Sequence, residues 1–242
     1  MLGGAKNIVC NFKQCFFDII FPKYCLLCGQ EGTYWCDTCQ TKDILAWGKS
    51  CFKCHVAGAD LNLCSACQES YFFDGLLCAS DYEDQTISAL IQTCKYRFVK
   101  ELTLTLGLLM SNYLTKELAS SRNVFFKDFF KATVVPVPLS KSRQNWRGFN
   151  QAELIAKVVV DYFNLDYNSN LKRLKHRPPQ AKLSEAKRLT NMTNCFSFSG
   201  PAPKKIILID DVVTTGTTVN ECAKVLRACG ATEILVLACA KG

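Results

Sequence analysis

The segment from Ile206 to Thr218 constrains the fold of this 242-residue chain more than any other part of its sequence. It reads Ile-Ile-Leu-Ile-Asp-Asp-Val-Val-Thr-Thr-Gly-Thr-Thr, and an apolar stripe with helical spacing follows it. Four consecutive aliphatic residues predict a strand that is buried on both faces, and the hydroxyl-rich turn with one glycine leads into a helix. Ligands of open α/β sheets bind at the carboxyl ends of the strands, so the two acids and the turn are expected to form a ligand site.

Each part of this segment has a chemical task. Backbone N–H groups of the turn and of the helix N-terminus can hold a phosphate, and the glycine lets the backbone approach it closely. The two carboxylates would repel a bare phosphate, but they accept hydrogen bonds from the vicinal hydroxyls of a ribose. The predicted ribose-phosphate site therefore consists of Asp210, Asp211, Thr214, Thr215, Gly216, Thr217 and Thr218.

Two other interpretations of the segment were considered. In a purely structural one, the acids cap a threonine-rich helix start. A nucleotide site of the usual kinds would need a Gly-x-x-x-x-Gly-Lys-Ser/Thr or a Gly-x-Gly-x-x-Gly loop, and the sequence contains neither.

The chain from residue 76 onward alternates between strand-like and helix-like patterns. This alternation predicts a mostly parallel sheet covered by helices. Strands are expected at 76–80, 132–137, 195–198, 205–209 and 234–238, and helices over 87–94, 102–114, from about 150, and over 219–229. Residues 172–191 are basic and polar, contain two consecutive prolines and predict a long loop, which in a compact domain is usually functional.

Half of the 16 cysteines form four Cys-x-x-Cys pairs within residues 25–67. Two such turns complete a tetrahedral shell of four thiolates, which is typical of structural zinc. Two zinc sites are therefore predicted, with the ligands Cys25, Cys28, Cys36, Cys39, Cys51, Cys54, Cys64 and Cys67. Sequential use of the pairs is favoured because each site then closes a short loop, and an interleaved arrangement stays open.

Two details of the second cysteine set bear on its chemistry. The string Cys51-Phe52-Lys53-Cys54-His55 matches a c-type haem attachment sequence, but haem would leave the following pair without partners. His55 also stands where the first set has Gly29, which puts the geometry of the second turn in question.

The remaining cysteines are single, and several stand where an apolar residue is expected, so we interpret them as small core residues. They are Cys10, Cys15, Cys78, Cys94, Cys195, Cys222, Cys229 and Cys239. We expect no signal peptide and no transmembrane segment, since no apolar run approaches the roughly 18 residues needed to span a bilayer. The expected location is the cytoplasm. Residues 1–21 predict an amphipathic helix that packs on the protein or, alternatively, on a membrane surface.

The basic residues are concentrated near the predicted site. The formal charge is +8, but two zinc ions with four thiolates each would lower it to about +4. Residues 139–190 hold eleven Lys and Arg against four Asp and Glu, which favours an anionic ligand such as a pyrophosphate, a nucleotide or a nucleic acid.

The segment 206–218 closely resembles the ribose-phosphate motif of type I phosphoribosyltransferases. The wider chain resembles the ComF family, in which such a domain follows an N-terminal zinc ribbon. The resemblance extends over the cysteine pairs, Cys94-Lys95-Tyr96, Val135-Pro136-Val137-Pro138, Arg147-Gly148-Phe149-Asn150-Gln151 and the acidic loop, in the family's order. It implies a type I phosphoribosyltransferase-like α/β domain over 76–242 and a double zinc ribbon over 22–70, which follow the helix expected over 1–21.

The resemblance also implies roles for residues. Asp210 and Asp211 would hold the ribose 2- and 3-hydroxyls of 5-phosphoribosyl-1-pyrophosphate (PRPP), and 214–218 its 5-phosphate, with magnesium bridging the pyrophosphate and ribose oxygens. The loop after Pro138 would face the pyrophosphate, and the long loop would be the hood that closes over substrate. Candidate residues in these loops are Lys141, Arg143, Arg147, Asn150, Gln151, Arg177, Gln180, Lys182 and Arg188, of which Arg143, Arg147 and Arg177 are candidates for catalysis. Asn150 and Gln151 could orient pyrophosphate oxygens or cap a helix, and His176 is expected to be merely exposed.

Two functions fit these expectations. One is a phosphoribosyltransferase that acts on an unidentified acceptor, a nucleobase or an amine. The other is implied by the family: PRPP binding in natural competence, with handling of incoming single-stranded DNA beside competence proteins at the inner membrane. Trp146, Phe149 and Tyr162 are compatible with binding of a single strand, although they could equally belong to the core.

Overall fold

The computed structural model describes residues 22–40, 44, 47–120, 124–174 and 195–242. It contains two compact units, Met1–Asp43 and Ile44–Gly242, each of which is described by itself. The expected N-terminal helix and the long loop with Arg177, Gln180, Lys182 and Arg188 lie outside the described residues. Among the helices that are described, none has the length and apolar character needed to cross a membrane.

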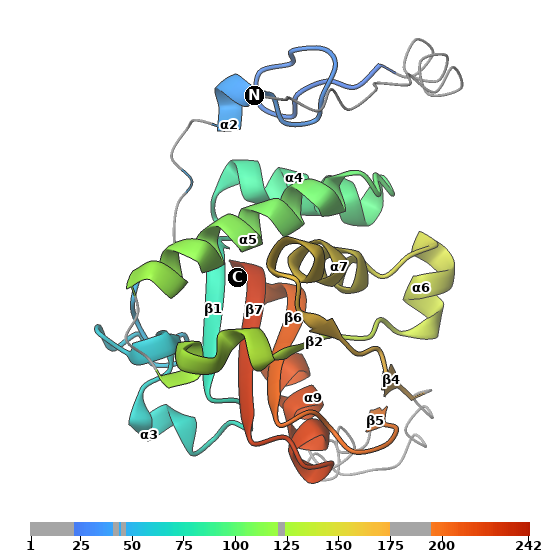
Figure 1. The fold of residues 1–242 in the computed structure, drawn as a ribbon. Coiled ribbons are helices and arrows are strands. Elements are labelled where there is room, and N and C mark those ends of the chain that lie inside the picture. Colours follow the sequence, from blue (N-terminus) through green and yellow to red (C-terminus); the bar gives the residue numbers. More distant parts are fainter. Residues whose placement is uncertain (1–21, 41–43, 45–46, 121–123, 175–194) are drawn as a thin grey trace, which may run out of the picture. The chain divides into compact units, whose positions relative to one another are not determined.

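The second unit is built on a five-stranded parallel sheet with the order β1-β7-β6-β2-β3 (Figure 1). Its strands are β1 (Gly75–Asp81), β2 (Thr133–Pro136), β3 (Asp166–Tyr167), β6 (Lys205–Val213) and β7 (Glu233–Lys241). A separate antiparallel pair consists of β4 (Leu171–Arg173) and β5 (Phe196–Phe198). The predicted mostly parallel sheet is thus confirmed, and parallel strands buried on both faces explain the continuous aliphatic runs.

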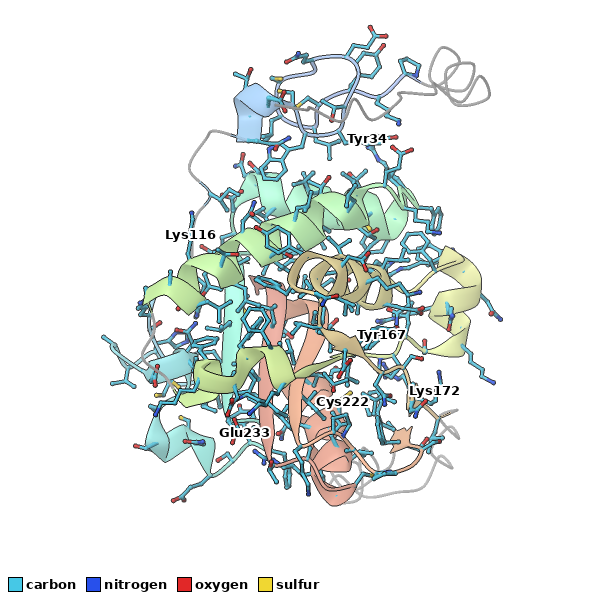
Figure 2. The ribbon with its side chains drawn as sticks, in the orientation of Figure 1. Tyr34, Lys116, Tyr167, Lys172, Cys222 and Glu233 are labelled. Carbon is cyan, nitrogen blue, oxygen red and sulfur yellow. The ribbon has the colours of Figure 1, made fainter. Side chains whose placement is uncertain are left out.

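Helices cover both faces of this sheet. The helices in this part of the chain include α4 (Gln85–Tyr96), α5 (Leu102–Ser120), α6 (Lys141–Arg147), α7 (Gln151–Phe163) and α9 (Thr217–Ala228), with the 3-10 helices η1 (Asp60–Asn62) and η2 (Val124–Lys131). α5 and α7 pack on one face, and α9 packs on the other, where Cys222 is fully buried (Figures 1 and 2). Asp84 caps α4 by accepting from the backbone N–H groups of Thr86 and Ile87, which fixes where that helix begins.

The single cysteines behave as predicted where they are described. Cys78, Cys94 and Cys239 are almost completely buried, as is Cys222, and burial raises the pKa of the Cys94 thiol to about 12. Cys195 and Cys229 are partly buried against the core. Cys10 and Cys15 belong to the undescribed N-terminal segment.

The two cysteine sets lie in different units. The first unit contains α2 (Asp37–Gln40) and the first set. The second set, with α3 (Ser65–Gln68), lies in the unit of the sheet, where Phe52 and Leu63 are buried in the same apolar cluster as Leu76 and Val219. The division of the chain therefore falls between residues 43 and 44, inside the segment 22–70 that was expected to form one ribbon module. The domain boundaries expected from the sequence stay predictions.

Candidate functional site

Asp210 and Asp211 lie at an open position of the sheet. β6 extends through both acids, because β7 pairs with it as far as Val213. β2 on the other side ends at Pro136, which pairs with Ile209. The acids thus belong to the strand itself, whereas the sequence predicted that they follow it. Beyond Pro136 they have a neighbouring strand on one side only, which leaves their other side free for a ligand.

The two acids are held differently. Asp211 forms an ion pair with Lys95, with 2.8 Å between Oδ1 and Nζ. Asp210 accepts a hydrogen bond from the backbone N–H of Asp211 at 2.8 Å. The pKa of Asp210 is raised to about 7, mainly because the carboxyl is removed from water and also because the charge of Asp211 repels it. A carboxylate in this state gains from ligand hydroxyls or a cation that restore the interactions it lost with water.

The turn after the acids has the geometry of a phosphate cradle. Gly216 adopts a left-handed conformation with φ of 77° and precedes α9 directly. The hydroxyls of Thr215 and Thr217 lie 2.9 Å apart, and the side chains of this turn are exposed. Asp210 and residues 212–219 enclose a hollow of about 50 Å³ above the helix N-terminus. This arrangement supplies backbone N–H groups, hydroxyls and a favourable helix dipole to an anion.

The turn rests on the second cysteine set. A Cβ placed on Gly216 would lie 3.0 Å from Cε2 of Phe52 and 3.5 Å from Tyr71. Phe52 is 3% exposed, and its ring packs at 5.0 Å from Tyr71 and 5.8 Å from Phe73. Glycine is thus required at 216 by its backbone angle and also by this close approach.

A larger pocket of about 450 Å³ adjoins the acids. It collects most of the residues that the sequence proposed for the site. Its lining includes Arg143, Arg147, Asn150, Gln151, Asp210, Asp211, Thr214 and Thr218 together with Lys95, Tyr96, Trp146 and Arg173. The sequence assigned no role to Lys95 or Arg173. The Cys94-Lys95-Tyr96 string pointed to the first of them, whereas only the fold brings β4 and Arg173 to this place.

The segment after Pro138, expected to be a loop, is helical. Ser140 caps α6 by accepting from the backbone N–H of Arg143, and Gly148 ends the helix with φ of 78°. The capping potential of a serine three residues before Arg143 outweighed the turn signal of the preceding prolines. Arg143 is consequently exposed on α6, and Arg147 is directed inward.

Arg147 and Gln151 form a buried pair at the pocket. The guanidinium donates to Oε1 of Gln151 at 2.9 Å. Nε of Arg147 and Nε2 of Gln151 have no hydrogen-bond partner within the described part of the chain. Gln151 does not cap α7. Asn150 stands at the cap position, but its side chain donates to the carbonyl of Val137 at 3.0 Å instead. Two unsatisfied donors in a polar pocket are suited to an oxyanion.

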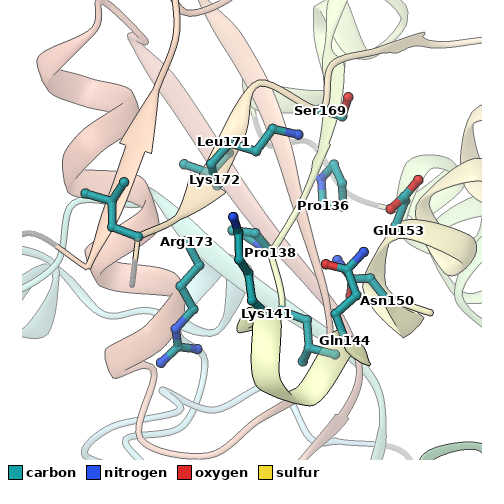
Figure 3. Close-up of a pocket in the computed structure, with 12 residues that line it drawn as sticks. Pro136, Pro138, Lys141, Gln144, Asn150, Glu153, Ser169, Leu171, Lys172 and Arg173 are labelled. Atoms are coloured by element: carbon teal, nitrogen blue, oxygen red, sulfur yellow. The ribbon is translucent and has the colours of Figure 1, made fainter. Parts of the chain in front are cut away.

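A second pocket of about 400 Å³ adjoins the first (Figure 3). The two share Pro138, Leu139, Asn150 and Arg173 in their linings. Lys141 and Lys172 are added here, and the only acid in the lining, Glu153, is paired with Lys157. The ligand pocket therefore continues into a basic one.

The cysteines group in sequential order, as favoured from the sequence. In each set, one from Cys25 to Cys39 and one from Cys51 to Cys67, the four sulfurs lie within 4.8 Å of one another. The Cys28–Cys36 and Cys54–Cys64 sulfurs are 3.6 Å apart. Tetrahedral zinc with Zn–S bonds of about 2.3 Å requires neighbouring sulfurs about 3.8 Å apart, so both sets fit this metal.

The first cysteine of each set is prepared for metal binding. Burial raises the pKa of Cys25, but hydrogen bonds with the backbone of Cys36, Cys28 and Leu27 outweigh it, and its pKa falls to about 6. Cys51 has the same balance of effects and the same pKa of about 6. Such thiols ionise readily to the thiolates that zinc binds.

His55 does not disturb the second turn. Its φ is 61°, close to the 73° of Gly29. Each donates its backbone N–H to the carbonyl of the first cysteine of its set at 2.9 Å. The question raised by His55 is therefore answered: both turns have the same geometry, and His55 adopts the left-handed conformation with a side chain.

Comparison with known proteins agrees with the fold. The phosphoribosyl transferase domain family matches residues 147–241. Competence protein F of Haemophilus influenzae is 40% identical over 108 residues, which cover 43% of this chain and 47% of that protein. DNA utilization protein YhgH of Salmonella typhimurium is 29% identical over 224 residues, 89% of this chain and 95% of that protein. Competence protein ComFC of Streptococcus pneumoniae is 35% identical over 122 residues, 50% of this chain and 53% of that protein.

The matched segments thus span about half the length of the two competence proteins and almost all of YhgH. The domain match includes the strand with the two acids, the threonine turn and the buried Arg147–Gln151 pair. With its phosphoribosyltransferase domain, its parallel sheet and its two cysteine sets, the chain is similar to the competence and DNA utilization proteins of the ComF family.

Proposed function

We propose that the pocket at the end of β6 binds PRPP. Asp210 and Asp211 accept hydrogen bonds from the ribose hydroxyls, and the turn 214–218 holds the 5-phosphate. The observation that carries this proposal is the adjacency of a carboxylate pair and a phosphate cradle on one strand-turn-helix segment. A plain phosphate would gain nothing from the acids, whereas a ribose phosphate uses both parts.

Other residues in the lining of the pocket are suited to the pyrophosphate. Arg147 and Gln151 offer donors that lack a partner in the described structure, and Arg143 and Lys95 add positive charge. PRPP carries magnesium on its pyrophosphate, and the carboxylates of Asp210 and Asp211 provide the oxygen ligands that this ion prefers. The candidates for catalysis remain Arg143, Arg147 and Arg177.

In the cell, we propose that the protein acts in DNA uptake during natural competence and handles incoming single-stranded DNA. The names of its relatives, competence protein F and DNA utilization protein, support this role. The basic second pocket beside the PRPP site supports an anionic polymer as partner. On this proposal the protein works in the cytoplasm with competence proteins at the inner membrane, and each cysteine set holds one zinc ion.

Calorimetric titration with PRPP and magnesium tests the site. The wild type should bind, and a double variant with Asp210→Asn and Asp211→Asn should lose at least about 100-fold in affinity, because two charge-assisted hydrogen-bonding groups are removed. The exposed acid Asp161 on α7 provides the control Asp161→Asn, which should bind like the wild type. Equal affinity of the double variant and the control would refute the assignment.

Phosphoribosyl transfer is the alternative activity, and the domain match favours testing it. Pyrophosphate release is measured with PRPP, magnesium and a panel of nucleobases, amines and DNA ends. Release that depends on one acceptor establishes an enzyme. Tight PRPP binding without release from any acceptor establishes a binding protein.

A further inference from the structure

Three aromatic side chains gather at the mouth of the PRPP pocket instead of in the core. Tyr96 is 60% exposed, Trp146 56% and Phe98 41%. The rings of Phe98 and Trp146 have centroids 5.0 Å apart in an edge contact, and those of Tyr96 and Trp146 are 6.2 Å apart. Tyr96 and Trp146 also line the pocket. We call this set the aromatic platform.

The platform differs from two other exposed rings of the described structure. Tyr162 is 47% exposed, but its hydroxyl bonds to Asn112, and it does not line either pocket. Phe130 is 72% exposed and packs on Phe129 in η2, also outside the pockets. A contiguous group of exposed aromatic rings, in contrast to single ones, marks a binding surface.

Positive charge surrounds the platform. Arg147 holds its guanidinium 5.7 Å from the ring centre of Tyr96 and 5.9 Å from that of Trp146. Arg97 and Lys100 are exposed just after Tyr96 in the sequence, and Arg143 is exposed one helical turn before Trp146. Exposed aromatic rings beside cations are the arrangement by which proteins hold single-stranded nucleic acid.

Basic side chains also line the second pocket, which adjoins the PRPP pocket. The second pocket, reached past Pro138 and Asn150, adds Lys141 and Lys172 (Figure 3). Cations in the linings of both pockets suit a polymer that carries a phosphate at every unit. A free nucleobase would need a closed slot with groups that bond its edge, whereas these rings are open to solvent.

We propose that the aromatic platform stacks a base of single-stranded DNA and so holds the strand across the mouth of the PRPP pocket. This inference rests on the proposed function and adds to it the place where the strand binds. Paired bases in a duplex present no face for stacking, so the platform selects single strands.

Emission from Trp146 provides the test. It is the most exposed of the three tryptophans, since Trp35 is buried and Trp47 is half-buried. An oligothymidylate of about eight nucleotides should quench it, and a duplex of equal length should not. In polarisation measurements with a labelled oligothymidylate, Trp146→Ala should weaken binding about 5- to 150-fold, the usual effect of removing one stacked base.

Conservative and control variants separate stacking from folding. Trp146→Phe keeps a flat ring and should retain most of the affinity, and Tyr96→Ala repeats the loss if Trp146→Ala does not fold. Phe130→Ala removes an even more exposed ring, one that lines neither pocket, and should bind the oligonucleotide like the wild type. A loss below twofold in both Ala variants of the platform, or an equal loss in Phe130→Ala, overturns the proposal. Quenching by free thymine at the concentration that saturates with the oligonucleotide also overturns it.

Failure of the PRPP assignment is distinguishable from failure of this inference. The double variant of Asp210 and Asp211 should lose PRPP in calorimetry and still show quenching by the oligonucleotide. If the wild type does not bind PRPP but the Trp146→Ala effect is present, the platform stands and the PRPP assignment falls.

Discussion

Replacement of Gly216 by alanine tests the phosphate turn most directly. At φ of 77° an alanine costs about 1–2 kcal/mol relative to a right-handed conformation. Its Cβ would also lie 3.0 Å from Cε2 of Phe52, which cannot yield freely because it is enclosed by Tyr71 and Phe73. Overpacking of a buried contact costs about 1–3 kcal/mol. If the alanine variant keeps the native turn, the total of about 2–5 kcal/mol corresponds to roughly 30- to 5000-fold in an equilibrium constant.

Two measurements show whether this free energy is lost from folding stability or from ligand binding. Either the turn keeps its conformation and thermal unfolding shows the loss, or the turn departs from it and calorimetry shows weaker PRPP binding. Gly230→Ala is the matched control, because Gly230 has φ of 109° but its nearest foreign atom is Nζ of Lys204 at 4.0 Å. It should lose stability without losing PRPP affinity. Combination of Gly216→Ala with Phe52→Leu should recover part of the loss. A Gly216→Ala protein with wild-type stability and wild-type affinity would refute the reasoning.

Further predictions concern the cysteine sets and the acids. Cys51→Ser should lower the zinc content by about one ion per chain and weaken PRPP binding, whereas Cys25→Ser should lower zinc equally and leave PRPP binding within about twofold; metal analysis and calorimetry check both. PRPP affinity should rise between pH 6 and pH 8, because the pKa of Asp210 near 7 must be exceeded before its carboxylate can accept the ribose hydroxyls; calorimetry in matched buffers measures it. In the folded protein the pKa of Asp210 lies above its ordinary value of 3.8. Asp210 therefore stabilises the fold fully below about pH 4, and this contribution is lost as the pH rises through 7. Asp210→Asn should accordingly raise the melting temperature of the ligand-free protein more at pH 8 than at pH 5. His55→Gly should preserve zinc binding and change stability by less than about 1 kcal/mol, since relief of the left-handed strain is offset by the greater freedom of glycine when unfolded.

Much of the fold follows from local patterns in the sequence. The aliphatic run 206–209 and the run 234–238 predicted two strands of a mostly parallel sheet, and both are longer in the structure, where they pair with each other. The Cys-x-x-Cys spacing predicted two metal sets because four ligands within a short segment leave few ways to group them. These features depend on residues that are close together in the sequence, so they can be predicted from it.

Other features depend on contacts between distant segments. The proximity of Phe52 and Gly216 joins residues far apart in the chain, and neither residue has a pattern that indicates the other. Arg173 reaches the pocket only because β4 passes beside it. The helix α6 could have been recognised from Ser140, a common N-cap residue, had the two prolines before it not suggested a loop. Of Trp146, Phe149 and Tyr162, only Trp146 lines the pocket.

The position of the second cysteine set gives a zinc ion bound there a role in supporting the phosphate turn. Its Phe52 belongs to the same apolar cluster as Val213 and Val219, which lie on either side of the phosphate turn. Loss of metal from this set would free Phe52 from the turn between Cys51 and Cys54 and so remove the support beneath Gly216. The first set lies in the other compact unit. We therefore expect the two zinc ions to be separable in function: the second maintains the PRPP site, and the first is available to stabilise a surface for partners.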